Sequence, residues 1–189
     1  MSYLFLACSV ALSLVFGASS ASKVGRSAFR GFTASAGPLK MLPQSFRPLA
    51  SRAVVVAEIA LTAVLLIGTG AAATSALVPV AVVGLAGAAV LLLAFTIAIV
   101  ATLRRGGQQA CRCFGARAIP LGPAHVVRNA LLLAVALAGL VTVSGADPSV
   151  EPGGAALAGV AGLVAGLLVT RFDDLTDLFS TPEISAGGR

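Results

Sequence analysis

Five long apolar stretches, separated by shorter polar segments, dominate the pattern of residues along the chain. They cover residues 3–21, 53–73, 77–103, 125–146 and 154–170. Each is close to the length of about 17–25 residues with which a helix crosses the hydrocarbon core of a bilayer. Because a spanning segment must satisfy its backbone polar groups internally, we predict an all-α fold, an integral membrane helical bundle with five transmembrane helices.

The segments between these stretches differ in character. Residues 22–52 are basic and contain three prolines, so we expect a short helix near 25–35 and then irregular chain, both lying in the membrane interface. Residues 104–124 form a Gly- and Arg-rich loop that holds two cysteines. Residues 147–153 read as a short acidic turn, and residues 171–189 as a polar tail.

Composition supports the membrane assignment. Of the 189 residues, 58% are hydrophobic and 11% are charged, whereas about a quarter of a soluble domain is charged. The net charge of +6 does not indicate a nucleic-acid-binding protein, because the basic residues flank apolar spans. With no Trp and a single Tyr, aromatic platforms for stacking bases are also scarce.

The charges are distributed unequally over the two sides of the predicted bundle. All 13 Lys and Arg residues fall on one side, and the opposite side carries only Asp147 and Glu151. The positive-inside rule then places the N-terminus outside, and the C-terminus and the cysteine loop on the cytoplasmic face of the cell membrane.

The two loop cysteines, Cys111 and Cys113, are one residue apart. A disulfide requires Cα atoms about 4.4–6.8 Å apart, which residues at this spacing reach only in a bent backbone. Such a disulfide is strained and easily reduced, which suits an exchanging pair better than a structural one. Arg112, Arg128 and the positive end of the fourth span favour the nucleophilic thiolate.

Other interpretations of these residues remain open. The two cysteines could be unreactive thiols, or they could bind a metal together with His125, although this spacing matches no common zinc pattern and we expect no metal. Arg128 could instead bind a lipid phosphate. Cys8, in the first span, fits a small buried hydrophobic residue.

A carboxylate and a glycine pair stand out within the spans. Glu58 lies inside the second span, where a charge needs a partner, and Lys23 at the same end of the first span is the candidate. The pair could serve a proton or redox site, or it could be a structural clamp between two helices. Gly162 and Gly166 predict tight helix packing, either within the bundle or between two copies of the chain.

The loop and its surroundings resemble a known family. The resemblance rests on Cys111, Cys113, Phe114, Gly115 and Leu121, then Val127-Arg128-Asn129, with weaker similarity upstream at Phe16-Gly17, Ser22-Lys23, Phe29, Pro43, Glu58 and Gly68. This pattern is similar to the methylamine utilisation protein MauE family and to the wider DoxX-like membrane proteins. It implies a four-span MauE/DoxX-like domain over residues 1–146, an additional span over 147–170 and a tail over 171–189.

The resemblance also implies a function. MauE proteins are associated with thiol–disulfide chemistry and a thioredoxin-like partner in the extracytoplasmic maturation of methylamine dehydrogenase, which is rich in disulfides. Cys111 and Cys113 would be the redox pair, while four other residues match family positions to which the resemblance assigns no role: Lys23, Glu58, Arg128 and Asn129. With one cysteine pair and Cys8, the chain cannot hold a two-pair relay, so a partner must supply or accept electrons.

Three functions are therefore compatible with the sequence. The first is a membrane thiol–disulfide exchange protein, which would be an oxidoreductase. The second is a non-catalytic scaffold or assembly factor, which could form homo-oligomers through Gly162 and Gly166. The third is a small transporter that uses Glu58, but no pair of Gly- or Pro-broken spans indicates inverted repeats. No cofactor motif is evident, and the sequence does not identify a quinone site.

Overall fold

The structure of the protein, a computed structural model, describes residues 1–35, 43–105, 110–111, 119–120, 122–145 and 150–171. In this part of the chain, five helices are long and apolar enough to cross a membrane. They are α1 (Ser2–Ala21), α3 (Arg47–Gly68), α4 (Val78–Arg104), α5 (Pro123–Val143) and α6 (Pro152–Thr170). The predicted all-α membrane bundle is thereby confirmed.

The remaining elements are short and connect the spans. Helix α2 (Arg26–Ser35) follows α1, near the predicted 25–35. The 3-10 turns η2 (Thr69–Ala72) and η3 (Ser75–Leu77) join α3 to α4. Strands β1 (Ala110–Cys111) and β2 (Ile119–Pro120) pair antiparallel, with Cys111 opposite Ile119, between α4 and α5.

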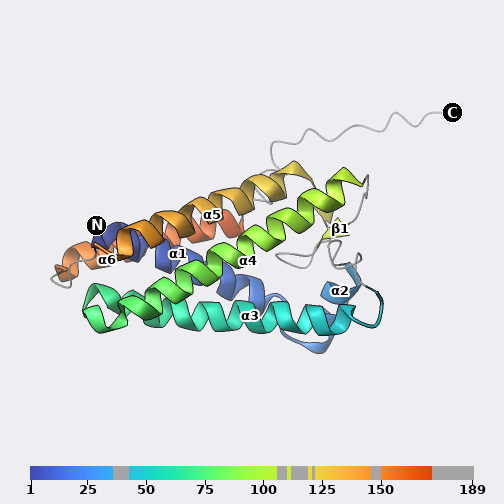
Figure 1. Cartoon of the computed structure of the whole chain (residues 1–189), viewed down its shortest axis with the longest axis horizontal. Coiled ribbons are helices and arrows are strands. Elements are labelled where there is room, and N and C mark those ends of the chain that lie inside the picture. Colours follow the sequence, from blue (N-terminus) through green and yellow to red (C-terminus); the bar gives the residue numbers. More distant parts are fainter. Residues whose placement is uncertain (36–42, 106–109, 112–118, 121, 146–149, 172–189) are drawn as a thin grey trace.

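Four of the spans form a closed ring, with the fifth outside it. Helix α1 packs against α3 and α5, and α4 packs against the same two helices from the other side. Helix α6 packs on α1, so α1 lies between three neighbours (Figure 1). This enclosure explains why α1 buries several serines, because a small side chain allows neighbouring helices to approach closely. A buried hydroxyl can also be paired within the helix: Ser13 Oγ donates a hydrogen bond to the carbonyl oxygen of Ser9 at 2.7 Å.

The start of α3 corrects one sequence prediction. We expected the second span to begin at residue 53, but the helix begins at Arg47, with Pro48 in its first turn. Proline is favourable there because the first backbone N–H groups of a helix have no partner within the helix. Arg47 and Arg52 interrupt the apolar pattern without interrupting the helix.

Helix α6 docks through its glycines. A Cβ atom added at Gly162 would lie 2.5 Å from the carbonyl oxygen of Ala7, and one at Gly166 would lie 3.0 Å from that of Ala11. The absence of side chains therefore lets the backbones of α6 and α1 approach each other closely. Of the two roles open for this glycine pair, the structure uses it for packing within the chain.

The ring interior is divided along its length. Its core is apolar at the end where α1 begins, with Phe5, Leu12, Leu65, Leu85 and Val143 fully enclosed. At the other end, several polar side chains are also buried: Ser19, Lys23, Ser51, Glu58, His125, Arg128 and Asn129. We call this second end of the bundle the basic end. It comprises α2, the last turns of α1, α4 and α6, and the first turns of α3 and α5.

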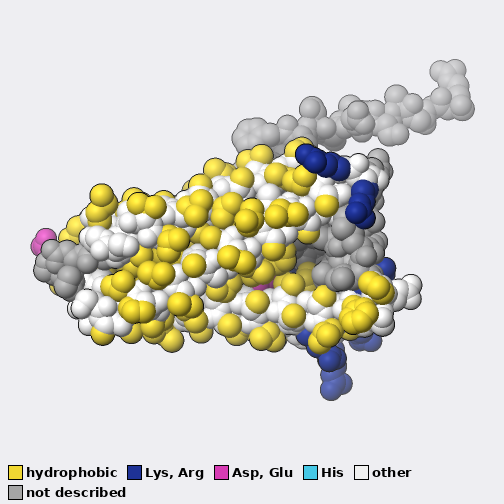
Figure 2. Space-filling view, viewed as in Figure 1, with side chains coloured by type: hydrophobic (Ala, Val, Ile, Leu, Met, Phe, Trp, Pro, Cys, Tyr) yellow, Lys and Arg dark blue, Asp and Glu magenta, His cyan; other side chains and the backbone are white. Residues whose placement is uncertain are grey.

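The surface of the bundle also differs between its sides and its end. The face of the bundle that Figure 2 shows carries apolar side chains along most of its length, as expected for a surface in contact with lipid. Lys and Arg side chains gather at the basic end in Figure 2; the exposed arginines of the described residues there are Arg26, Arg30, Arg52, Arg104, Arg105 and Arg171. The protein is therefore a multi-pass membrane protein with one strongly basic end.

Candidate functional site

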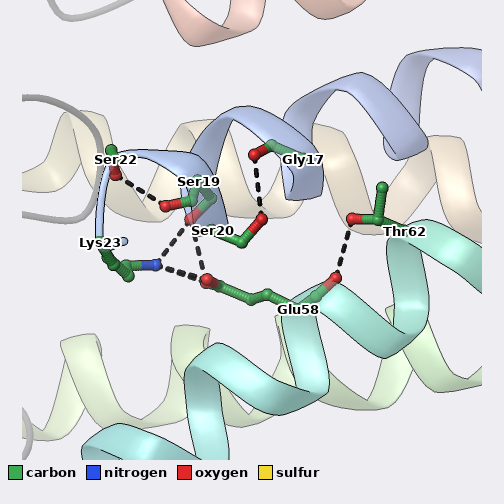
Figure 3. A network of polar contacts seen from close by, with 7 residues as sticks. All are labelled: Gly17, Ser19, Ser20, Ser22, Lys23, Glu58 and Thr62. Atoms are coloured by element: carbon green, nitrogen blue, oxygen red, sulfur yellow. Dashed lines mark hydrogen bonds and ion pairs between the residues drawn. The ribbon is translucent and has the colours of Figure 1, made fainter. Parts of the chain in front are cut away.

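The last turn of α1 supplies two polar side chains on one face. Ser19 and Lys23 are four residues apart, so they lie one above the other, with Lys23 just beyond the end of the helix. The Lys23 ammonium donates a hydrogen bond to Ser19 Oγ at 2.7 Å. Both side chains are buried, and both point toward α3 (Figure 3).

Glu58 of α3 completes a buried ion pair. Lys23 Nζ lies 2.6 Å from Glu58 Oε1 and 2.7 Å from Oε2, and Ser19 Oγ donates to Oε1 at 2.9 Å (Figure 3). Both charged side chains are at most 4% exposed. The two residues that the sequence placed at the same end of two spans are thus in direct contact, and they join α1 to α3.

An aromatic ring from α2 covers this ion pair. Lys23 Nζ lies 5.0 Å from the centre of the Phe32 ring, within the range of a cation–π interaction. Gly25, at a φ of 110°, makes the turn between α1 and α2 in a conformation that other residues rarely adopt. The turn leads from α1 into α2, whose Phe32 ring lies against the Lys23 ammonium.

The environment of Lys23 opposes its charge. Burial lowers the pKa of the Lys23 ammonium; the nearby Glu58 carboxylate acts in the opposite direction, and the positive charge of Arg128 adds to the lowering. Desolvation is the largest effect, as expected for an amine removed from water.

The first two turns of α5 bury three polar residues beside the ring interior. His125, Arg128 and Asn129 are each at most 5% exposed. His125 also shapes the start of the helix: its backbone N–H donates to the Gly122 carbonyl oxygen at 3.1 Å, and its Nδ1 accepts from the Gly122 N–H at 3.5 Å. Pro123 occupies the first turn, so the helix begins two residues before the predicted span, which starts at 125.

Of the two loop cysteines, the structure describes only the backbone of Cys111. The backbone of Cys111 lies in β1 at the basic end, where α2 contacts this strand. The Cys111 side chain and all of Arg112 and Cys113 lie outside the described residues, so the disulfide, thiolate and metal interpretations stay predictions. Cys8 is a free, buried cysteine in the first half of α1, away from this end.

Sequence reasoning missed two members of the site, Ser19 and Phe32. The spacing of four residues between Ser19 and Lys23 was a usable signal, because it places both on one helix face. Phe32 gave no comparable signal, since its contact depends on how α2 folds back at Gly25. Ser51, two turns before Glu58, was also missed; its buried Oγ has no hydrogen-bond partner among the described residues.

The sequence that forms this site matches one protein family over most of its length. The sequence model described as methylamine utilisation protein MauE matches residues 1–142. The chain belongs to the MauE family. The match spans α1 to α5 and so contains the ring of four helices and the buried ion pair, while α6 lies beyond it. No curated protein and no solved structure matches the chain significantly.

Membership of the MauE family gives the protein its general role. It is an integral membrane protein of methylamine utilisation, built on a four-helix ring whose basic end carries a buried Ser19–Lys23–Glu58 network. The network can hold α1, α2 and α3 together, and it can keep one cation and one carboxylate paired inside the membrane domain.

Proposed function

We propose that this MauE protein exchanges thiols and disulfides with a thioredoxin-like partner through Cys111 and Cys113. The client of this exchange would be a disulfide-rich enzyme such as methylamine dehydrogenase. The observation that carries the proposal is the position of the Cys111 backbone, in a strand at the basic end of the bundle and in contact with α2. A thiol near that end can meet a partner outside the hydrocarbon core.

The proposed reaction is a balanced two-electron exchange. A thiolate of the Cys111–Cys113 pair attacks the disulfide of the partner, forming a mixed disulfide and releasing one partner thiolate. The second cysteine then attacks the mixed disulfide and releases the other. The pair in this chain becomes a disulfide, the partner becomes a dithiol, and the two thiol protons pass to the partner's sulfurs.

The surrounding charges favour the first step. Arg104 and Arg105 are exposed at the end of α4, and residues 106–109 separate them from β1. The positive N-terminal end of α5 follows β2. Cations and a helix N-terminus lower the pKa of a nearby thiol and so raise the fraction of thiolate. In this proposal Arg112 and Arg128 add to that field.

In the same proposal, the basic end faces the cytoplasm. The exposed arginines of the described residues lie at this end, whereas Glu151 lies at the other, and positively charged loops are retained on the cytoplasmic side. The extracytoplasmic maturation associated with the family requires the reverse orientation, so the partner and the orientation must be tested together.

Alkylation trapping tests the exchange. After a pulse of oxidant or reductant, Cys111 and Cys113 should change their redox state together, and a Cys113→Ser variant should accumulate a mixed disulfide with its partner. Cys8→Ser is the matched control, because Cys8 is buried in α1 and should leave both results unchanged. If both loop cysteines remain reduced in cells under oxidising stress, the proposal is wrong.

A non-catalytic scaffold is the second candidate. It is favoured by the buried Lys23–Glu58 ion pair and the close α1–α6 packing, which are features of a rigid assembly platform. The double variant Cys111→Ser/Cys113→Ser separates the two functions. Maturation of the client should be lost in this variant if the dithiol reacts, and retained if the protein only organises other components.

A further inference from the structure

One surface at the basic end combines exposed cations with exposed large apolar side chains. It is formed by the turn before α2, the outer face of α2 and the first turns of α3. Val24, Phe46 and Leu49 are 65%, 56% and 65% exposed. Arg26, Arg30 and Arg52 are also exposed, on the same two helices. We call these six residues the α2–α3 surface.

Helix α2 is amphipathic, and its basic face points outward. Phe32 is buried over Lys23, and Phe29 is half-buried, so these two residues mark the inner face. Arg26 and Arg30 are four residues apart and exposed, on the face turned away from Phe32. The Nε of Arg30 donates to the carbonyl oxygen of Arg26 at 3.2 Å, which holds the guanidinium along the outside of the helix. Such a helix is suited to lie in a membrane interface.

Arg52 continues this surface onto α3. Leu49, Arg52, Val56 and Ile59 are all exposed and recur at intervals of three or four residues, so they form one stripe on the lipid-facing side of the helix. Arg52 therefore has exposed apolar side chains on both sides of it along α3. An arginine in such a stripe extends its guanidinium to the headgroup level, where lipid phosphates lie.

The charge of this surface is not balanced nearby in the part of the chain that the structure describes. The described residues include two carboxylates. Glu58 is buried with Lys23, and Glu151 is exposed at the opposite end of the bundle. Helix α2 packs against α3, so the two helices that carry these arginines are neighbours at the basic end.

We propose that the α2–α3 surface binds the headgroups of anionic phospholipids. The arginines would contact phosphate, while Val24, Phe46 and Leu49 insert among the upper parts of the acyl chains. The apolar residues favour a lipid over an acidic soluble protein, because such a protein would match the charge but not the apolar stripe that continues along α3. The proposal does not depend on the cysteine pair.

Native mass spectrometry of the purified full chain tests the proposal, with phosphatidylglycerol and phosphatidylcholine as the two probes. Each cation at a membrane surface strengthens binding to anionic lipid by roughly fivefold. The protein should therefore retain phosphatidylglycerol in preference to phosphatidylcholine, and Arg30→Gln with Arg52→Gln should lower this preference by more than about tenfold. Arg104→Gln with Arg105→Gln removes the same charge from the same end and should change it much less.

Three results would overturn the proposal. The unaltered protein could retain both lipids equally, or the two double variants could lose the preference for phosphatidylglycerol equally. The third is that the Arg30/Arg52 variant loses binding to a soluble protein partner while its lipid preference is unchanged. If the Arg30/Arg52 variant does not fold, Arg30→Gln alone is measured, since α2 lies outside the spans. Cys111→Ser with Cys113→Ser should leave lipid retention unchanged, which separates this test from that of thiol exchange.

Discussion

Lys23 and Glu58 depend on each other because neither charge has access to water. Removing one partner of a buried ion pair leaves an uncompensated charge, which costs about 3–5 kcal/mol of stability. We therefore expect Glu58→Gln to lower the free energy of unfolding by that amount. Unfolding in mixed detergent micelles, followed by helical circular dichroism, measures the change.

A double substitution serves as the control for this prediction. Lys23→Met with Glu58→Leu replaces both charges by apolar groups of similar size and should restore most of the lost stability, because well-packed apolar residues often replace a buried pair without loss. If the restored protein also functions in cells, the pair is a structural clamp. If it is stable but inactive, the charges themselves take part in function.

Phe32 contributes to the same site through its ring. Phe32→Leu keeps a buried apolar side chain but removes the cation–π contact with Lys23, and it should cost about 0.5–2 kcal/mol. The same substitution in the Lys23→Met/Glu58→Leu background should cost less, since no cation remains. A double-mutant cycle gives the difference. Equal costs in both backgrounds would show that Phe32 acts only by packing.

At the scale of helices, the α6 glycines offer a direct comparison. A Cβ at Gly162 would meet the backbone of α1 at 2.5 Å, whereas one at Gly159 would meet nothing within 4 Å. Gly162→Ala should therefore destabilise the protein by about 1–3 kcal/mol through overpacking. Gly159→Ala should be neutral or stabilise it by at most about 1 kcal/mol. Thermal unfolding in detergent, compared between the two variants, checks this.

The elements also show what the sequence can and cannot predict. The five spans follow from apolar length alone, although α5 begins at Pro123, two residues before the predicted start. The start of α3 was misplaced, because Arg47 and Arg52 look like loop residues although a helix can carry them at a membrane interface. Gly162 and Gly166 did not predict that α6 packs against α1. Small residues permit close helix packing, but they do not determine which helix is the neighbour.

The sequence predicted only part of the candidate site. Lys23 and Glu58 could be paired in advance, because a charge inside a span requires a partner and few were available. Ser19 and Phe32 join them through the rotation of α1 and the turn at Gly25, which are consequences of the folded arrangement. The cysteine pair remains a prediction from the sequence and from the MauE family, with only the backbone of Cys111 placed by the structure.

For the whole molecule, the separation of charge leads to a prediction about orientation. In a background without cysteines, a single cysteine replacing Arg105 would stand at the basic end, and one replacing Gly153 at the opposite end. Both positions are exposed. If the positive-inside rule governs insertion, a membrane-impermeant maleimide should label the Gly153 position in intact cells and the Arg105 position only after permeabilisation. Labelling of both positions in the reverse pattern would place the Cys111–Cys113 loop outside the cytoplasm. It would then favour an extracytoplasmic thioredoxin-like partner, and it would mean that the charge bias of this chain does not set its topology.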